Sequence, residues 1–276
     1  MKHNQPDQQI GLYVGGHRGD GVASHIEMFP DAHWYVYEPA SENVAELANR
    51  FRNHPRVMIC PNAVVPDRSK VKQARLHHFG YQHGSDSLAQ EVSEQSRAVL
   101  ESTKYPRGHF SLRGFENVIT TDLPNEIAMI AHNASRLQQR FRIVALITDC
   151  QGLDLSIVKS VRQWLVNGEI EHMQCEVDHD YVPHYTGWPE EFGEVTNAVS
   201  AWREFFRGLP YEASSDINGW HYAHETSAEP DFQRDIVFTS RRAISPRNQT
   251  ISTAVVSDQP NVSSSPTFFG DRVRSI

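Results

Sequence analysis

Short apolar segments alternate with amphipathic helical patterns along most of this chain, and this alternation is the feature that most constrains its fold. Strands separated by helices form βαβ units, in which successive strands run parallel. We therefore predict a doubly wound α/β fold, with helices on both faces of a mostly parallel sheet. The predicted strands lie near residues 10–15, 33–38, 57–65, 143–149, 170–177 and 234–240.

Three helices can be placed between these strands. Ser41 is the predicted N-cap of a helix that carries Val44, Leu47, Ala48 and Phe51 on one face. Residues 123–140 are predicted to form a second helix, with Pro124 in its first turn. Apolar residues from Ile157 to Leu165 indicate a third helix, which ends near Gly168.

Two regions interrupt the alternation. Residues 70–114 are polar and rich in histidine, with a weaker strand signal at 71–79, and we expect an insertion that carries substrate contacts or an oligomer contact. Residues 181–230 are unusually aromatic. We predict one Rossmann-like domain over residues 1–244, followed by a disordered tail over 245–276, where Ser, Pro, Asn and Thr predominate.

Charge and composition exclude several classes of function. The net charge is −8 and the basic residues are scattered, so no basic stripe is present to follow a nucleic-acid backbone. No apolar run approaches the roughly 20 residues of a membrane span, and the N-terminus lacks a signal-peptide pattern. The three cysteines have no C-x-x-C spacing and lie in or beside predicted strands, which indicates reduced thiols and a cytoplasmic location.

A glycine turn follows the first predicted strand, in the run Val14-Gly-Gly-His-Arg-Gly19. A pyrophosphate cofactor favours G-x-G-x-x-G, with the phosphates at the N-terminus of the next helix. Here Val14 stands at the first glycine position, and Asp20 places a negative charge at the predicted helix start. Both features disfavour NAD and FAD.

S-adenosylmethionine carries no phosphate, and its cationic end tolerates a nearby carboxylate. Glu38 lies 38 − 19 = 19 residues after Gly19, at the end of the second strand, where a carboxylate can accept both ribose hydroxyls. Asn62 and Ala63 lie in the last part of the third predicted strand, where it crosses the adenine side of such a pocket. A tight turn with an incidental glutamate remains the structural alternative.

A second motif lies in the run from Ile143 to Ser160. A buried strand ends at Asp149, a turn at Gly152 follows, and a helix begins at once. The Asp149 carboxylate is thereby expected at the carboxyl edge of the sheet, where ligands bind in open α/β folds.

Taken together, these segments resemble the FkbM family of S-adenosylmethionine-dependent methyltransferases. The matches run in order over about residues 10–242: Val14–Gly19 for V-G-A-N-x-G, Tyr37-Glu-Pro39 for F-E-P, Asn62-Ala63, Asp149–Asp154 for D-x-E-G-x-E, and Asp235–Phe238 for the closing strand. Tyr13 stands where the family usually has an acidic residue, His17 replaces Asn, and Gln151 and Asp154 replace Glu.

The resemblance implies a seven-stranded class I methyltransferase fold with one antiparallel strand late in the chain. It also implies methylation of a hydroxyl on a sugar, glycan or small natural product. The residues expected to bind S-adenosylmethionine are Val14, Gly15, Gly16, His17, Gly19, Glu38, Pro39, Asn62 and Ala63.

A hydroxyl acceptor benefits from a general base near its proton. Asp149 is the first candidate, and His179, which follows Glu176 and Asp178 at the adjacent strand end, is the second. A divalent metal is considered but not favoured. Asp178, His179, Asp180 and His184 lie close in sequence and His221 and His224 have i, i+3 spacing, yet neither group matches a known zinc motif.

Two other functions stay open. The missing acidic residue at Tyr13, together with Gln151, suggests a module that binds the cofactor without turnover, and an NAD-dependent oxidoreductase is the third alternative. The expected partner is a small-molecule or glycan acceptor, and a homo-oligomer is compatible with the insertion.

Overall fold

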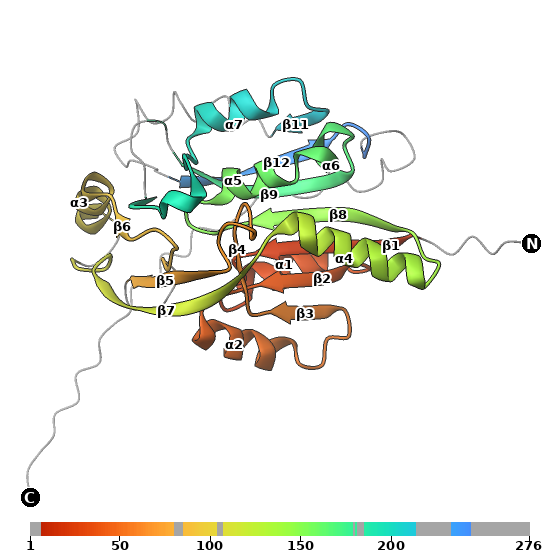
Figure 1. Ribbon diagram of the computed structural model, residues 1–276, viewed down its shortest axis with the longest axis horizontal. Coiled ribbons are helices and arrows are strands. Elements are labelled where there is room, and N and C mark those ends of the chain that lie inside the picture. The colour runs from red at the N-terminus through yellow and green to blue at the C-terminus, as the bar shows by residue number, and fades with distance from the viewer. Residues whose placement is uncertain are drawn as a thin grey trace, which may run out of the picture. The chain divides into compact units, whose positions relative to one another are not determined.

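The computed structural model describes residues 7–79, 85–103, 107–178, 180, 185–213 and 233–243 (Figure 1). These residues belong to one compact unit that spans Met1–Ala243. The tail predicted over 245–276 lies outside the described residues.

A seven-stranded sheet forms the centre of the fold, in the order β11-β12-β9-β8-β1-β2-β3. Six strands run in one direction and β12 is antiparallel to both of its neighbours. This confirms the mostly parallel α/β sheet, and the antiparallel strand comes last among the strands of the described residues. The strands are β1 (Gln8–Val14), β2 (His33–Tyr37), β3 (Val57–Cys60), β8 (Phe141–Thr148), β9 (Ile170–Asp178), β11 (Tyr211–Ala213) and β12 (Gln233–Ser240).

Successive residues of β1 contribute to two different hydrophobic cores, as expected for a strand that is buried on both faces. Leu12 and Val14 belong to one cluster, which includes residues of the helices that follow β7. Tyr13 belongs to the other, which includes Val22 and Leu47 of the first two helices. The helices are α1 (Asp20–Met28), α2 (Ser41–Phe51), α3 (Glu94–Thr103), α4 (Leu123–Arg136), α5 (Asp154–Ser160), α6 (Arg162–Val166) and α7 (Val199–Phe206).

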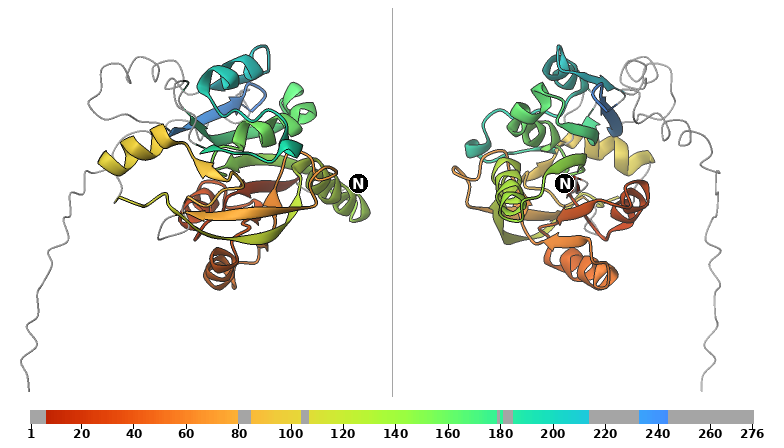
Figure 2. Two further views of the ribbon diagram at one scale, coloured as in Figure 1. Left: turned by 60° about the vertical axis from the view of Figure 1, so that its left-hand side comes forward. Right: turned by 90° about the vertical axis from the view of Figure 1, so that its right-hand side faces the viewer.

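The insertion folds as a smaller β-structure beside the main sheet (Figures 1 and 2). The strand signal at 71–79 is confirmed as β5 (Gln73–Phe79), which pairs antiparallel with β7 (Leu112–Thr121), a strand that we did not predict. β7 also pairs with β4 (Ala63–Val64). Far along the chain, β10 (Tyr185–Thr186) pairs with β6 (Glu91–Val92), which brings Tyr185 into contact with the insertion.

Several predicted boundaries are wrong for local reasons. The strand predicted over 57–65 is two strands, β3 and β4, because Pro61 between them has no N–H for a ladder. The helix predicted to reach residue 140 ends at Arg136, and Gln138 just beyond it has a left-handed φ of 55°. The third predicted helix is α5 and α6, divided at Val161.

The predicted N-cap at Ser41 is also wrong. Ala40 occupies the N-cap position and makes no side-chain capping bond, while Ser41 is the first helical residue of α2. The Ser41 backbone N–H instead donates to the carboxylate of Glu116 on β7, at 3.0 Å. A side chain distant in sequence therefore satisfies the helix start.

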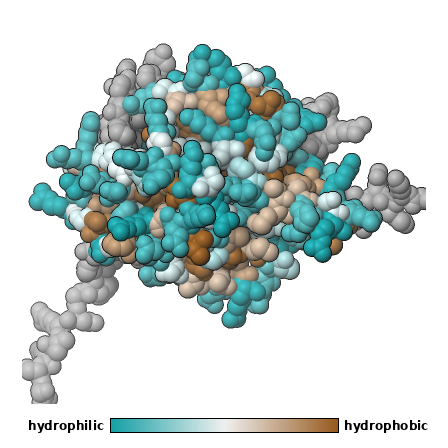
Figure 3. All heavy atoms as spheres, in the orientation of Figure 1, coloured by the Kyte–Doolittle hydropathy of each residue, from teal (hydrophilic) through white to brown (hydrophobic). Residues whose placement is uncertain are grey.

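The face of the molecule seen in Figure 3 is mainly hydrophilic, with small hydrophobic patches among the polar side chains. Large exposed hydrophobic residues include Leu112, Phe115 and Ile119 of β7. No helix within the described ranges is long and apolar enough to span a membrane.

Candidate functional site

The strands around β1 end in register at one edge of the sheet. Val14 pairs with Tyr37 and with Thr148, and Thr148 pairs with Cys175. The residues that come next along these four segments therefore lie side by side at this edge of the sheet. They are Glu38, Gly15, Asp149 and Glu176. Along the chain, β2 and β3 add to one side of β1, and β8 and β9 later add to its other side. The strand order therefore reverses between β1 and β8, and open α/β sheets bind ligands at such a topological switch point.

The backbone amides of the glycine turn are engaged within the protein. The N–H groups of Gly15 and Gly16 donate to the Tyr37 carbonyl at 2.9 and 3.1 Å, and that of Gly19 donates to the Gly16 carbonyl at 2.9 Å. The His17 N–H donates to Glu38 Oε2 at 2.7 Å. Four of the five amides from Gly15 to Gly19 are thus already used, so the turn cannot present them to a phosphate.

Protein packing explains the three glycines. A Cβ on Gly15 would lie 1.8 Å from the Asp149 carbonyl oxygen, and one on Gly16 would lie 2.5 Å from Val36. Gly19 is the N-cap of α1 with a left-handed φ of 91°, and it packs against α2. The glycines therefore let β1, the β8–α5 turn and α2 approach one another closely.

Glu38 is buried at the end of β2 and connects the glycine turn to α2. Besides the His17 amide, its carboxylate accepts the Ala40 N–H at 2.9 Å and the Asn43 side-chain amide at 3.4 Å, both on Oε1. Burial raises the pKa of Glu38, while these hydrogen bonds act in the opposite direction. A carboxylate offers about four acceptor positions, so Oε2 keeps one for a hydroxyl.

Asp149 faces a pocket at the switch point. Its backbone N–H donates to the Val14 carbonyl at 3.0 Å, and its Oδ1 accepts the side-chain amide of Gln151 at 2.9 Å. The side chain lines the pocket and is exposed to solvent there. Partial desolvation by the surrounding protein, together with the nearby carboxylates of Asp154 and Asp235, raises the pKa of Asp149 to about 7.

Further carboxyl groups lie behind Asp149. Asp154 is buried at the start of α5, where it accepts the backbone N–H groups of Cys150 and Gly152, each at 3.3 Å, and burial raises its pKa to about 6. Burial also raises the pKa of Glu176, whose Oε2 has no hydrogen-bond partner within the described part of the chain. This edge of the sheet is therefore rich in carboxyl groups that resist ionisation.

The pocket encloses about 710 Å³ of space between protein atoms, part of it open to solvent. Seven of the residues selected from the sequence line it, namely Gly15, His17, Glu38, Pro39, Asn62, Ala63 and Asp149. Val14, Gly16 and Gly19 belong to the turn but are not among the residues that line the pocket. His179 lies outside the described residues.

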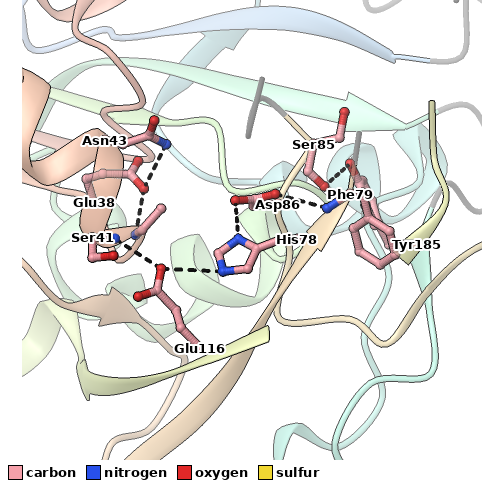
Figure 4. A network of polar contacts seen from close by, with 10 residues as sticks. Glu38, Ser41, Asn43, His78, Phe79, Ser85, Asp86, Glu116 and Tyr185 are labelled. Carbon is pink, nitrogen blue, oxygen red and sulfur yellow. Dashed lines mark hydrogen bonds and ion pairs between the residues drawn. The ribbon is translucent and has the colours of Figure 1, made fainter. Parts of the chain in front are cut away.

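One wall of the pocket comes from the insertion, through Leu76, Asp86, Ser87 and Leu88. Asp86 is held by His78 Nδ1 at 2.7 Å and by the Phe79 N–H at 3.0 Å, and His78 Nε2 lies 3.6 Å from Glu116 (Figure 4). The sequence indicated substrate contacts somewhere in residues 70–114 but singled out none of these residues. Only the β5–β7 pairing brings them to the pocket.

Tyr13 and Asp20 do not take the place of the missing acidic residue at the pocket. Tyr13 is buried against His25 and Trp34, and a Cβ on Gly21 would lie 2.3 Å from its hydroxyl. Asp20 forms an ion pair with Arg50 at 2.6 Å, and this pairing lowers the pKa of Asp20. Neither residue lines the pocket.

In the ranges that the structure describes, no group of three or more His, Cys, Asp or Glu side chains could hold a metal ion. Asp180, which we considered as a ligand, accepts the Ser200 N–H of α7 at 2.8 Å. Of the other candidates, His184, His221 and His224 lie outside the described residues. All three cysteines are free thiols.

No protein-family model and no curated protein matches this chain in sequence. Among solved structures, it is similar to a methyltransferase FkbM from Methylobacillus flagellatus KT, with 10% sequence identity and a TM-score of 0.42. The alignment covers 84% of this chain and 43% of that protein, so the chain spans less than half of its length.

Proposed function

We propose that this chain is an S-adenosylmethionine-dependent methyltransferase that acts on a hydroxyl of a sugar, glycan or small natural product. In this proposal, residues 1–244 form one doubly wound methyltransferase-like domain with the insertion near 70–114. The acceptor enters beside Asp149, and the cofactor nucleoside lies toward Glu38.

The observation that carries the proposal is the use of the turn amides. A pyrophosphate needs several outward N–H donors at the turn, but those of Gly15, Gly16, His17 and Gly19 donate within the protein. Acidic side chains line the pocket instead: Glu38 and Asp149 on either side of the glycine turn, and Asp86 on the wall formed by the insertion. Carboxylates at both ends favour a ligand that combines a ribose diol with a cationic group over a dinucleotide.

The pocket residues suit the chemistry of methyl transfer to a hydroxyl. The bound cofactor supplies an electrophilic methyl group, so the protein has to align the acceptor oxygen and exclude water. A carboxyl group with a pKa of about 7 can accept the acceptor proton near neutral pH, and Asp149 is such a group at the pocket wall. His179 stays the second candidate for this role.

Two alternatives make different predictions. A binding module would hold the cofactor without turnover, and the buried Tyr13 in place of an acidic residue supports this second candidate. An oxidoreductase would bind NAD, which the engaged turn amides disfavour.

Calorimetry of the full chain with S-adenosylhomocysteine and with NAD separates these functions. We expect binding of S-adenosylhomocysteine only, and mass spectrometry of a glycan and metabolite panel should then detect a product heavier by one CH₂ group. Binding of NAD alone would overturn the proposal. Binding of S-adenosylhomocysteine with no methylated product from any member of the panel would favour the binding module.

A further inference from the structure

The Gln151 side chain bridges Asp149 and Tyr185. Its Nε2 donates to Asp149 Oδ1 at 2.9 Å, and its Oε1 accepts a hydrogen bond from the Tyr185 hydroxyl. The NH₂ end of the amide faces Asp149, and this suits an ionised carboxylate because such a group only accepts hydrogen bonds. The oxygen end then faces the Tyr185 hydroxyl, which can donate to it.

Residues distant in sequence hold Gln151 in place. Ser87 Oγ of the insertion donates to the backbone carbonyl of Gln151 at 3.2 Å. The Tyr185 hydroxyl also lies 3.3 Å from the Ser85 carbonyl, and its ring is buried against the insertion (Figure 4). Gln151 itself has a left-handed φ of 58°, an uncommon conformation for a residue with a side chain. The insertion and β10 therefore support the turn from outside.

This arrangement leaves one oxygen of Asp149 for a ligand. Oδ1 is occupied by Gln151, whereas Oδ2 accepts no hydrogen bond from the described residues. Asp149 and Gln151 both line the pocket. The Gln151 amide holds Oδ1 at one end and contacts the Tyr185 hydroxyl at the other. Rotation of the Asp149 carboxylate is therefore restricted, and Oδ2 is directed away from Gln151.

We propose that Gln151 and Tyr185 are positioning residues that orient Asp149 as the general base of the methyl transfer. The inference rests on the proposed function. The proton of the acceptor hydroxyl passes to Asp149 Oδ2 while the acceptor oxygen bonds to the methyl carbon. The bond between the methyl carbon and the sulfur of S-adenosylmethionine breaks, and its electron pair stays on sulfur as a neutral thioether. The proton held by Asp149 later passes to water.

Other charges around Asp149 have to be considered in any pH test. Its pKa responds to Asp154 at the start of α5, to Asp235 of β12 and to His17 of the glycine turn, and Asp149 in turn influences Glu176 of β9. None of these four residues is changed in the variants below. A difference between variant and wild type therefore reports on the Gln151 contact.

The test compares Gln151→Glu and Tyr185→Phe with Tyr211→Phe. Tyr211 is a matched control because its buried hydroxyl also donates a hydrogen bond, at 2.7 Å to the Ile170 carbonyl, but it does not line the pocket. Gln151→Glu places a second carboxylate beside Asp149 Oδ1, so the acidic limb of the kcat profile should move up by about one pH unit or more. Tyr185→Phe should lower kcat by about tenfold to a hundredfold with little change in the Kd of S-adenosylhomocysteine. Tyr211→Phe should leave both unchanged.

A second readout does not need turnover. Carboxyl ¹³C NMR of the full chain, with Asp149 assigned through Asp149→Asn, gives the titration midpoint of Asp149 directly. We expect a higher midpoint in Gln151→Glu than in wild type. If wild type neither binds S-adenosylhomocysteine nor methylates, the proposed function fails and the NMR shift still decides whether Gln151 controls Asp149. An unchanged midpoint in Gln151→Glu, or a kcat in Tyr185→Phe equal to that of Tyr211→Phe, would overturn the inference.

Discussion

The carbonyl oxygen of Asp149 lies 1.8 Å from the point where a Cβ atom would stand on Gly15, so only glycine fits between β1 and the β8–α5 turn. Gly15 also has a φ of 85°, which side chains rarely adopt. The glycine that begins the turn thereby sets the position of the candidate base. It does so through protein contacts, with no ligand required.

Replacement of Gly15 by alanine should therefore destabilise the fold strongly. The new Cβ must displace backbone as well as adopt a strained φ, and we expect a loss of roughly 3 kcal/mol or more in urea unfolding. Gly208→Ala is the matched control, because Gly208 has a φ of 82° with no atom near its Cβ position. The control should lose only about 1 kcal/mol. Equal losses in the two variants would contradict the close contact.

Glu38 should discriminate between ribose and deoxyribose. If its carboxylate accepts a ribose hydroxyl, wild type should bind S-adenosylhomocysteine about 10- to 100-fold more tightly than the 2′- or 3′-deoxy analogue, as expected for a charge-assisted hydrogen bond. Glu38→Gln should lose most of this discrimination, whatever its effect on overall affinity. Calorimetry with the paired ligands checks this, and the same discrimination in both proteins would assign Glu38 a purely structural role.

Asp149→Asn should lower kcat by about 10²- to 10⁴-fold if Asp149 is the general base. In wild type, kcat/KM should rise with pH up to about 7 and then level off, because the base must be ionised. His179→Ala tests the second candidate under the same conditions. A normal rate in Asp149→Asn with a large loss in His179→Ala would transfer the role to His179, and normal rates in both would reject the two assignments.

The raised pKa of Asp149 also affects stability. The folded-state pKa of about 7 lies above the unfolded value of about 3.9, so this group favours the folded state most at low pH. That contribution is lost as pH rises from about 4 through about 7. The free energy of unfolding of Asp149→Asn, relative to that of wild type, should therefore increase as the pH rises from 5 to 8. Urea unfolding at each pH measures this difference.

Asp20→Asn serves as the control for this measurement. Arg50 lowers the pKa of Asp20 below its usual range, so Asp20 stays ionised in both states between pH 5 and pH 8. Its variant should show the same difference from wild type at both pH values. If Asp149→Asn behaves in the same way, the pKa of Asp149 is not raised.

Much of the fold followed from local patterns. The apolar segments that became β1, β2, β8, β9 and β12 are long enough to be recognised from hydrophobicity alone. The short strands β6 and β10 and the exposed strand β7 were missed, since their stability comes from partners distant in sequence. The start of α2 shows the same limit, because the Ser41 backbone N–H donates to the Glu116 carboxylate of β7, which is distant in sequence.

The sequence by itself determined the turn that follows β1 and the carboxylates that end β2 and β8, because strand ends, glycines and acidic residues are local features of the chain. Only the tertiary structure decided that the turn amides are consumed by Tyr37 and Glu38, that Asp86 and Ser87 form a pocket wall, and that Gln151 joins Asp149 to Tyr185. Each of these depends on strand register and on contacts between segments far apart in the chain, which no local pattern encodes.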